Sequence, residues 1–104
     1  MRDKILIVDD VEINRELLSE ILSSEYEILM AENGKQAMKV LEARHEEIAV
    51  LMLDLVMPEM DGFVVLRELD QRPWSKNIGI IIISSDNTIR TEAECFDLYR
   101  LMQL

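Results

Sequence analysis

The chain has 104 residues, of which 49% are apolar and 31% charged, and its 21 acidic and 11 basic side chains give a net charge of −10. This composition is typical of a globular protein, and no segment approaches the roughly 20 consecutive apolar residues that cross a membrane. The negative charge repels phosphate backbones and anionic lipids, so we expect no direct nucleic acid binding and no membrane binding by this chain. The length predicts a single domain over residues 1–104.

Cysteine content and the N-terminal sequence both bear on the cellular compartment. The single cysteine, Cys95, excludes an internal disulfide and a cysteine-based zinc site. The first residues lack the basic segment, long apolar stretch and small-residue cleavage site of a secretory signal. We therefore expect a cytoplasmic protein.

Short apolar runs alternate along the chain with segments of helical periodicity. In residues 11–24, for example, Ile13, Leu17 and Ile21 recur at helical spacing while glutamates fill the other side. The regular alternation favours a parallel sheet with helices on both faces. We expect Trp74 to cap one edge of this sheet. The predicted strands are 4–8, 26–30, 48–53 and 78–84, the predicted helices are 11–24, 32–44 and 63–69, and a loose loop is predicted over 71–77.

Carboxylates stand at the ends of two predicted strands. Asp9 and Asp10 follow the first strand and Asp54 follows the third, so the three acids converge if those strands are neighbours. Acids held so close raise one another's pKa unless a cation lies among them, and Mg²⁺ is a hard ion that takes carboxylate ligands and keeps several waters. A carboxylate beside such an ion can act as a nucleophile toward a phosphoryl group. Ser84 ends the fourth strand and Ser85 follows it, so both reach the same edge.

Three segments in register carry a family resemblance. "ILIVDD" near the start, "LMLDLVMPEMDG" in the middle and "IIIISSD" later are separated by helix-sized gaps. In this order they resemble the receiver domain of two-component response regulators, over roughly the first 90 residues. The resemblance implies a flavodoxin-like, doubly wound α/β fold with strand order 2-1-3-4, its fifth strand missing here. It also implies a signalling module and not an enzyme.

The resemblance also implies a role for each acid. Asp54 would be the phosphoacceptor, supplied by a sensor histidine kinase or a small phosphodonor, and the output would pass to a downstream effector domain or protein. Asp9, Asp10 and Asp54 would bind Mg²⁺ with the backbone carbonyl of Val56. Ser84 would be the switch hydroxyl that follows the phosphoryl group.

The C-terminal part departs from the family pattern. A receiver normally continues into a fifth strand that ends in lysine and proline, and then into a fifth helix. We expect none of the four lysines to replace the missing one, and we expect a domain that is incomplete at its C-terminus. The fourth strand, with four isoleucines, would then be an open edge, which predicts self-association through that edge or by exchange of the last helix. The lysines are Lys4, Lys35, Lys39 and Lys76.

Other interpretations of the same residues stay open. A receiver that has lost its switch would serve as a phosphorylation-independent dimerisation or docking module. A magnesium-dependent phosphatase of the haloacid dehalogenase kind would show Asp-x-Asp after the first strand, whereas Asp9 and Asp10 are adjacent. A flavodoxin-like FMN site would need a phosphate-binding loop rich in Ser, Thr and Gly at that point. His45 reads as a solvated helix end and not as a phosphodonor.

Overall fold

The computed structural model describes residues 3–55, 57 and 61–83. Strands and helices alternate along this part of the chain, as the sequence predicts, and most predicted boundaries are correct to within two residues. The elements are β1 (Lys4–Val8), α1 (Glu12–Leu22), β2 (Glu27–Ala31), α2 (Gly34–Arg44), η1 (His45–Glu47), β3 (Ile48–Asp54), α3 (Gly62–Asp70), η2 (Pro73–Asn77) and β4 (Gly79–Ile83).

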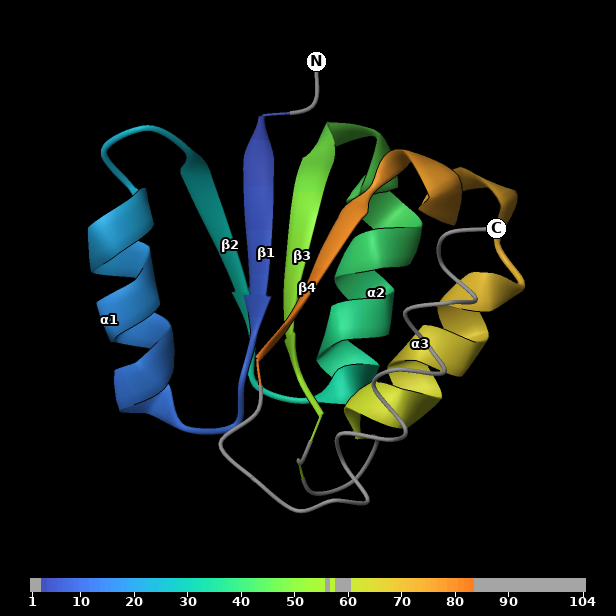
Figure 1. Ribbon diagram of the computed structural model, residues 1–104, viewed down its shortest axis with the longest axis horizontal. Helices are drawn as coiled ribbons and strands as arrows, with labels where there is room; N and C mark the ends of the chain where they lie inside the picture. The colour runs from blue at the N-terminus through green and yellow to red at the C-terminus, as the bar shows by residue number, and fades with distance from the viewer. Residues whose placement is uncertain (1–2, 56, 58–60, 84–104) are drawn as a thin grey trace.

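The four strands form one parallel sheet in the order β2-β1-β3-β4, and their arrows all point the same way in Figure 1. This confirms the predicted fold class and strand order. The strands are rich in Ile, Leu and Val, as parallel strands covered on their faces are. Within the described residues β4 is an edge strand, as predicted, and β2 is the other edge.

One face of the sheet is fully packed. Leu6, Leu51 and Leu53 point toward this face and are completely buried. They contact the inner sides of α2 and α3, which present Leu41 and Val65, also completely buried. This face therefore holds the main core. Burial of each large aliphatic side chain contributes roughly 1.5 to 3 kcal/mol to stability.

The opposite face is covered by α1, which packs on β1 and β2. Ile5 and Ile7 are buried but stand apart from the main core, because alternate side chains of a strand point to opposite faces. No residue of α1 itself is buried. The predicted helix forms, but its apolar side is only partly used, since Ile13, Leu17 and Ile21 are 62%, 52% and 70% exposed.

The segment predicted as a loose loop is ordered. Residues 73–77 form the short 3₁₀ helix η2, with Pro73 at its first turn. The Trp74 ring stacks on His45, with ring centroids 4.3 Å apart and an interplanar angle of 7°, and it packs against the main core. That Trp74 caps an edge of the sheet stays a prediction, because its described contacts are with His45 and the main core. The prediction that His45 is a solvated helix end is wrong, because the ring is half-buried against Trp74.

No helix within the described ranges is long and apolar enough to cross a membrane.

Candidate functional site

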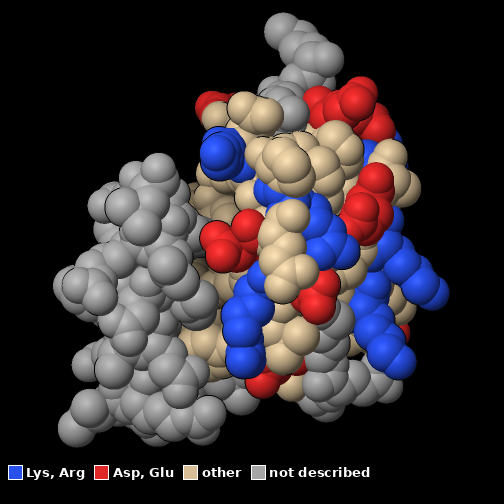
Figure 2. Space-filling view, turned by 90° about the vertical axis from the view of Figure 1, so that its right-hand side faces the viewer, with Lys and Arg blue, Asp and Glu red and all other residues tan. Residues whose placement is uncertain are grey.

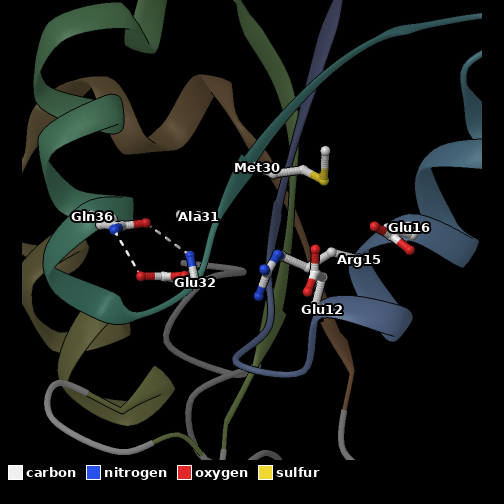
Figure 3. Close-up of a pocket in the computed structure, with 7 residues that line it drawn as sticks. All are labelled: Glu12, Arg15, Glu16, Met30, Ala31, Glu32 and Gln36. Carbon is white, nitrogen blue, oxygen red and sulfur yellow. Dashed lines mark hydrogen bonds between the residues drawn. The ribbon is translucent and has the colours of Figure 1, made fainter.

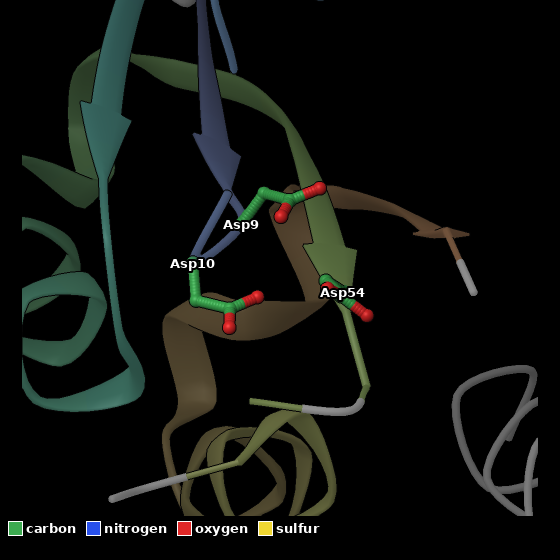
Figure 4. Close-up of side chains that lie close together, drawn as sticks. All are labelled: Asp9, Asp10 and Asp54. Atoms are coloured by element: carbon green, nitrogen blue, oxygen red, sulfur yellow. The ribbon is translucent and has the colours of Figure 1, made fainter. Parts of the chain in front are cut away.

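The register of the sheet brings the predicted acids together. Val8 pairs with Leu53 across β1 and β3, so the chain leaves these neighbouring strands side by side, through Asp9 and Asp54. Asp10 is the next residue of the turn into α1. Figure 4 shows the three carboxylates at the same end of the sheet. The carboxyl ends of parallel strands are where open α/β sheets place their ligands.

The acid cluster, defined as Asp9, Asp10 and Asp54, is compact and partly buried. One carboxylate oxygen from each residue lies within 4.8 Å of the others. Asp9 and Asp54 are only 2% and 5% exposed, whereas Asp10 is exposed. Three anions held this close, two of them shielded from water, repel one another and attract a cation. The donor set consists of hard oxygen atoms, which suits Mg²⁺.

Asp9 is held in place by the first residues after β1. Its carboxylate accepts hydrogen bonds from the Val11 backbone N–H at 2.9 Å and from the Asn14 side-chain amide at 3.3 Å. The Arg15 guanidinium donates to the Asp9 carbonyl oxygen at 2.6 Å. Both oxygens of the carboxylate are therefore oriented before any ligand arrives. No sequence pattern predicts these roles of Asn14 and Arg15, although their position in the first turns of α1 puts them within reach of the turn after β1.

The start of α3 packs closely against the end of β3, next to Asp54. The Gly62 backbone N–H donates to the Leu55 carbonyl at 3.1 Å, which folds the start of α3 back against the end of β3. A methyl group on Gly62 would lie 2.7 Å from the Leu55 Cα and even closer to the Asp54 carbonyl oxygen. Only glycine fits there. Asp61 caps α3 by accepting the Val64 N–H at 3.1 Å, so its carboxylate has a structural use.

Two predicted site residues, Val56 and Ser84, lie outside the described residues, as does Pro58 of the same loop. Ser84 directly follows Ile83, which pairs with Asp54 across β3 and β4. The assigned roles of all five predicted site residues remain predictions.

The lysines of the described region lie where the sequence predicted. Lys4 begins β1 and Lys76 precedes β4, at the end of the sheet away from the acid cluster. Lys4 is engaged there with Glu27 and Glu47, at 2.5 and 3.4 Å, and its hydrogen bond to Glu27 raises the pKa of the ammonium group. Lys35 and Lys39 lie on α2. That none of the four replaces the missing lysine of the family remains a prediction.

A small pocket of about 220 Å³ lies beside the turn that holds Asp9, between α1 and the end of β2 (Figure 3). Glu12, Arg15 and Glu16 of α1 line one side of it. On the other side the Gln36 side-chain amide forms two hydrogen bonds with Glu32. Its oxygen accepts from the Glu32 backbone N–H at 3.0 Å, and its nitrogen donates to the Glu32 carboxylate at 3.3 Å. These bonds fix the loop that leads from β2 into α2.

The sequence matches the response regulator receiver domain family over residues 5–99, and the chain therefore belongs to that family. Among curated proteins, it is 34% identical over 96 residues to response regulator RR06 of Streptococcus pneumoniae, covering 91% of this chain and 42% of that protein. It is 37% identical over 86 residues to response regulator PleD of Caulobacter vibrioides, covering 82% of this chain and 18% of that protein. The chain thus spans less than half the length of these two relatives.

Solved receiver structures share the fold. A response regulator receiver protein from Pseudomonas putida superposes with a TM-score of 0.83 at 25% identity, covering 94% of this chain and 80% of that one. The CheX-CheY-BeF3-Mg complex from Borrelia burgdorferi gives a TM-score of 0.81 at 28% identity, covering 92% of this chain and 72% of that one. These neighbours confirm the predicted flavodoxin-like receiver fold.

Proposed function

We propose that this receiver domain accepts a phosphoryl group on Asp54 and so acts as a signalling module of a two-component phosphorelay. The observation that carries the proposal is the convergence of Asp9, Asp10 and Asp54 within 4.8 Å at the carboxyl end of the sheet. Family membership supports the same assignment. We propose no catalytic turnover by the domain itself.

The residues of the acid cluster fit Mg²⁺. Asp9, Asp10 and Asp54 would hold the ion, and we propose the carbonyl of Val56 as a further ligand. When bound, Mg²⁺ neutralises charge on the transferred phosphoryl oxygens and lowers the repulsion among the three carboxylates. The bonds from Val11 and Asn14 to Asp9 supply the orientation that such a site needs.

The proposed transfer is a single displacement at phosphorus. A carboxylate oxygen of Asp54 forms a new P–O bond while the P–N bond to a histidine of the partner kinase breaks, and the electron pair of that bond stays on the imidazole nitrogen. The product is an aspartyl phosphate. Ser84 is proposed as the hydroxyl that then donates to a phosphoryl oxygen, because it directly follows Ile83, the β4 partner of Asp54.

A second candidate function is a docking or dimerisation module that works without phosphorylation. The placement of the lysines favours it, because Lys4 and Lys76 lie at the far end of the sheet and Lys4 is engaged with glutamates. Without a lysine to pair with the phosphoryl group, its arrival would have a weaker effect on the rest of the domain.

The proposed partners are a sensor histidine kinase, a downstream effector domain or protein, and a second copy of the chain. Self-association through β4 is supported by its edge position in the described sheet and by Ile81, which is 51% exposed on it. Exchange of the last helix involves residues outside the described ones. We propose no direct contact with nucleic acid or membrane, on the basis of the net charge of −10, and a cytoplasmic location.

Intact-mass spectrometry after brief exposure to acetyl phosphate tests the proposal. We expect a gain of one phosphoryl group that requires Mg²⁺ and is lost in Asp54→Asn. The matched control is Asp70→Asn, which removes an exposed carboxylate at the end of α3 and should leave the gain intact. A folded protein that gains no mass, or gains it equally in Asp54→Asn, would refute phosphoacceptance at Asp54 and favour the docking module.

A further inference from the structure

Basic side chains of this acidic protein stand among acidic ones on the face that α2 and α3 form. In Figure 2 blue side chains project over α2 and α3, with red ones among them. An open groove of about 690 Å³ runs between these helices, with Met38 among its lining residues. Lys35 and Lys39, one helical turn apart on α2, line one side. On the other side, Arg72 is already paired with Glu42 at 2.7 Å and with Glu68 at 3.1 Å.

The two lysines of this groove form no ion pair with any described residue. Like charges at positions i and i+4 of a helix face each other and destabilise it slightly. Three cations and two glutamates line the groove, so it keeps a net charge of +1 while Lys35 and Lys39 form no described ion pair, and Met38 gives the groove an apolar part. Such a groove suits a segment that brings carboxylates at the same helical spacing together with apolar side chains.

Helix α1 has that complementary pattern. Glu12, Glu16 and Glu20 recur at four-residue spacing, and no ion pair links them to other described residues. One residue further along, the apolar stripe of Ile13, Leu17 and Ile21 runs beside them, more than half exposed at each position. Figure 3 shows Glu12 and Glu16 on α1. An exposed apolar stripe of this length beside unpaired acids is typical of a contact surface.

We propose that α1 of one copy docks in the α2–α3 groove of a second copy. Glu16 and Glu20 would pair with Lys39 and Lys35, since both pairs have the spacing of one helical turn. Leu17 and Ile21 would cover the apolar part of the groove. The docked segment is a helix of the same chain because α1 combines the matching charges, the matching spacing and an uncovered apolar stripe.

This contact is head-to-tail. The two surfaces differ and lie on different helices, so each copy keeps one free groove and one free α1, and association can continue into a ring or a chain. The net charge of −10 on each copy opposes the approach, which local pairing must overcome. The contact is independent of β4 and of phosphorylation at Asp54, so it stands or falls separately from the proposed function.

Two charge-reversal variants of the full chain test this contact by sedimentation velocity. Lys35→Glu/Lys39→Glu blocks the groove and keeps α1, while Glu16→Lys/Glu20→Lys blocks α1 and keeps the groove. We expect the wild type to associate with rising concentration, and each variant alone to associate at least about tenfold more weakly. Mixed at equal amounts, the two variants should associate again, because each α1 then meets a groove of opposite charge on the other variant.

The mixture also controls for net charge. The Glu16→Lys/Glu20→Lys variant carries the smaller negative charge, so charge alone would make that variant self-associate more than the mixture does. Urea unfolding of each variant shows whether it is folded, and association in the mixture requires that both are. A monomeric wild type, a mixture that stays monomeric, or variants that self-associate as the wild type does would overturn the proposal. If the variants self-associate as the wild type does, the contact would instead involve β4, which neither variant alters.

Discussion

Gly62→Ala tests whether the return of the chain at the start of α3 supports the site. The new methyl group would lie 2.7 Å from the Leu55 Cα and closer still to the Asp54 carbonyl oxygen, and both atoms belong to the backbone. Backbone cannot give way as the end of a flexible side chain does. Overpacking of this kind costs about 1 to 3 kcal/mol, and strain on the Gly62–Leu55 hydrogen bond adds about 1 kcal/mol. The better helix propensity of alanine offsets about 1 kcal/mol.

We therefore expect Gly62→Ala to lower the free energy of unfolding by about 1 to 3 kcal/mol and to weaken Mg²⁺ binding, because the end of β3 that carries Asp54 must shift. Urea unfolding and isothermal titration calorimetry with Mg²⁺ measure the two effects. The matched control is Gly79→Ala in β4, where the added methyl group meets ordinary contacts at 3.6 and 3.8 Å. Equal stability of the two variants, or unchanged Mg²⁺ affinity in Gly62→Ala, would refute the reasoning.

Three further outcomes follow from the described contacts. Asp61→Ala removes the cap of α3 and should cost about 1 kcal/mol in urea unfolding, and an unchanged midpoint would contradict the capping role. The hydrogen bond from Arg44 holds the pKa of Glu47 at about 2, below its ordinary value of 4.5, so the stability that this carboxylate adds should be complete above pH 4.5 and disappear as the pH falls toward 2. In Glu47→Gln that part of the acid dependence should be missing, and unfolding curves of both proteins from pH 6 to about 2 would check it. Leu41→Ala should lower the free energy of unfolding by about 2 to 5 kcal/mol, because this side chain is fully buried, and Ile21→Ala should lower it by less than about 0.5 kcal/mol, because this side chain is 70% exposed. Similar losses in urea unfolding would contradict the position of the main core between the sheet and α2.

The sequence predicts the sheet well because its signals are local. Each strand is a short apolar run between polar turns, and the order of such runs with helices between them allows few topologies. The convergence of Asp9 and Asp54 follows from the same logic, since both residues end strands that became neighbours. Asp10 comes with them because it is next in the chain. Family resemblance then adds the roles that geometry alone leaves open.

Packing and tertiary contacts were harder to predict. The periodicity of α1 shows an apolar side but not how much of it meets the sheet, and Ile13, Leu17 and Ile21 are in fact largely exposed. The stacking of His45 on Trp74 joins residues 29 positions apart in sequence, and no local pattern indicates it. The bond from Asn14 to Asp9 likewise depends on how the first turn of α1 is placed against the end of β1.

The two faces of the sheet suggest that the proposed phosphoryl transfer and the proposed relay of the signal would be separable in this domain. The described contacts that position Asp9 and the end of β3 come from β1, β3, the first turns of α1 and the start of α3, which are joined by strand register and hydrogen bonds. The packed core behind α2 and α3 makes that framework stiff. By contrast, the α1 face and the β4 edge carry exposed apolar side chains. A change at the acid cluster can therefore leave the core as it is, and its readout would depend on what contacts the α1 face and the β4 edge. Substitutions at Leu17 or Ile81 should accordingly alter association and leave the gain of a phosphoryl group by mass unchanged.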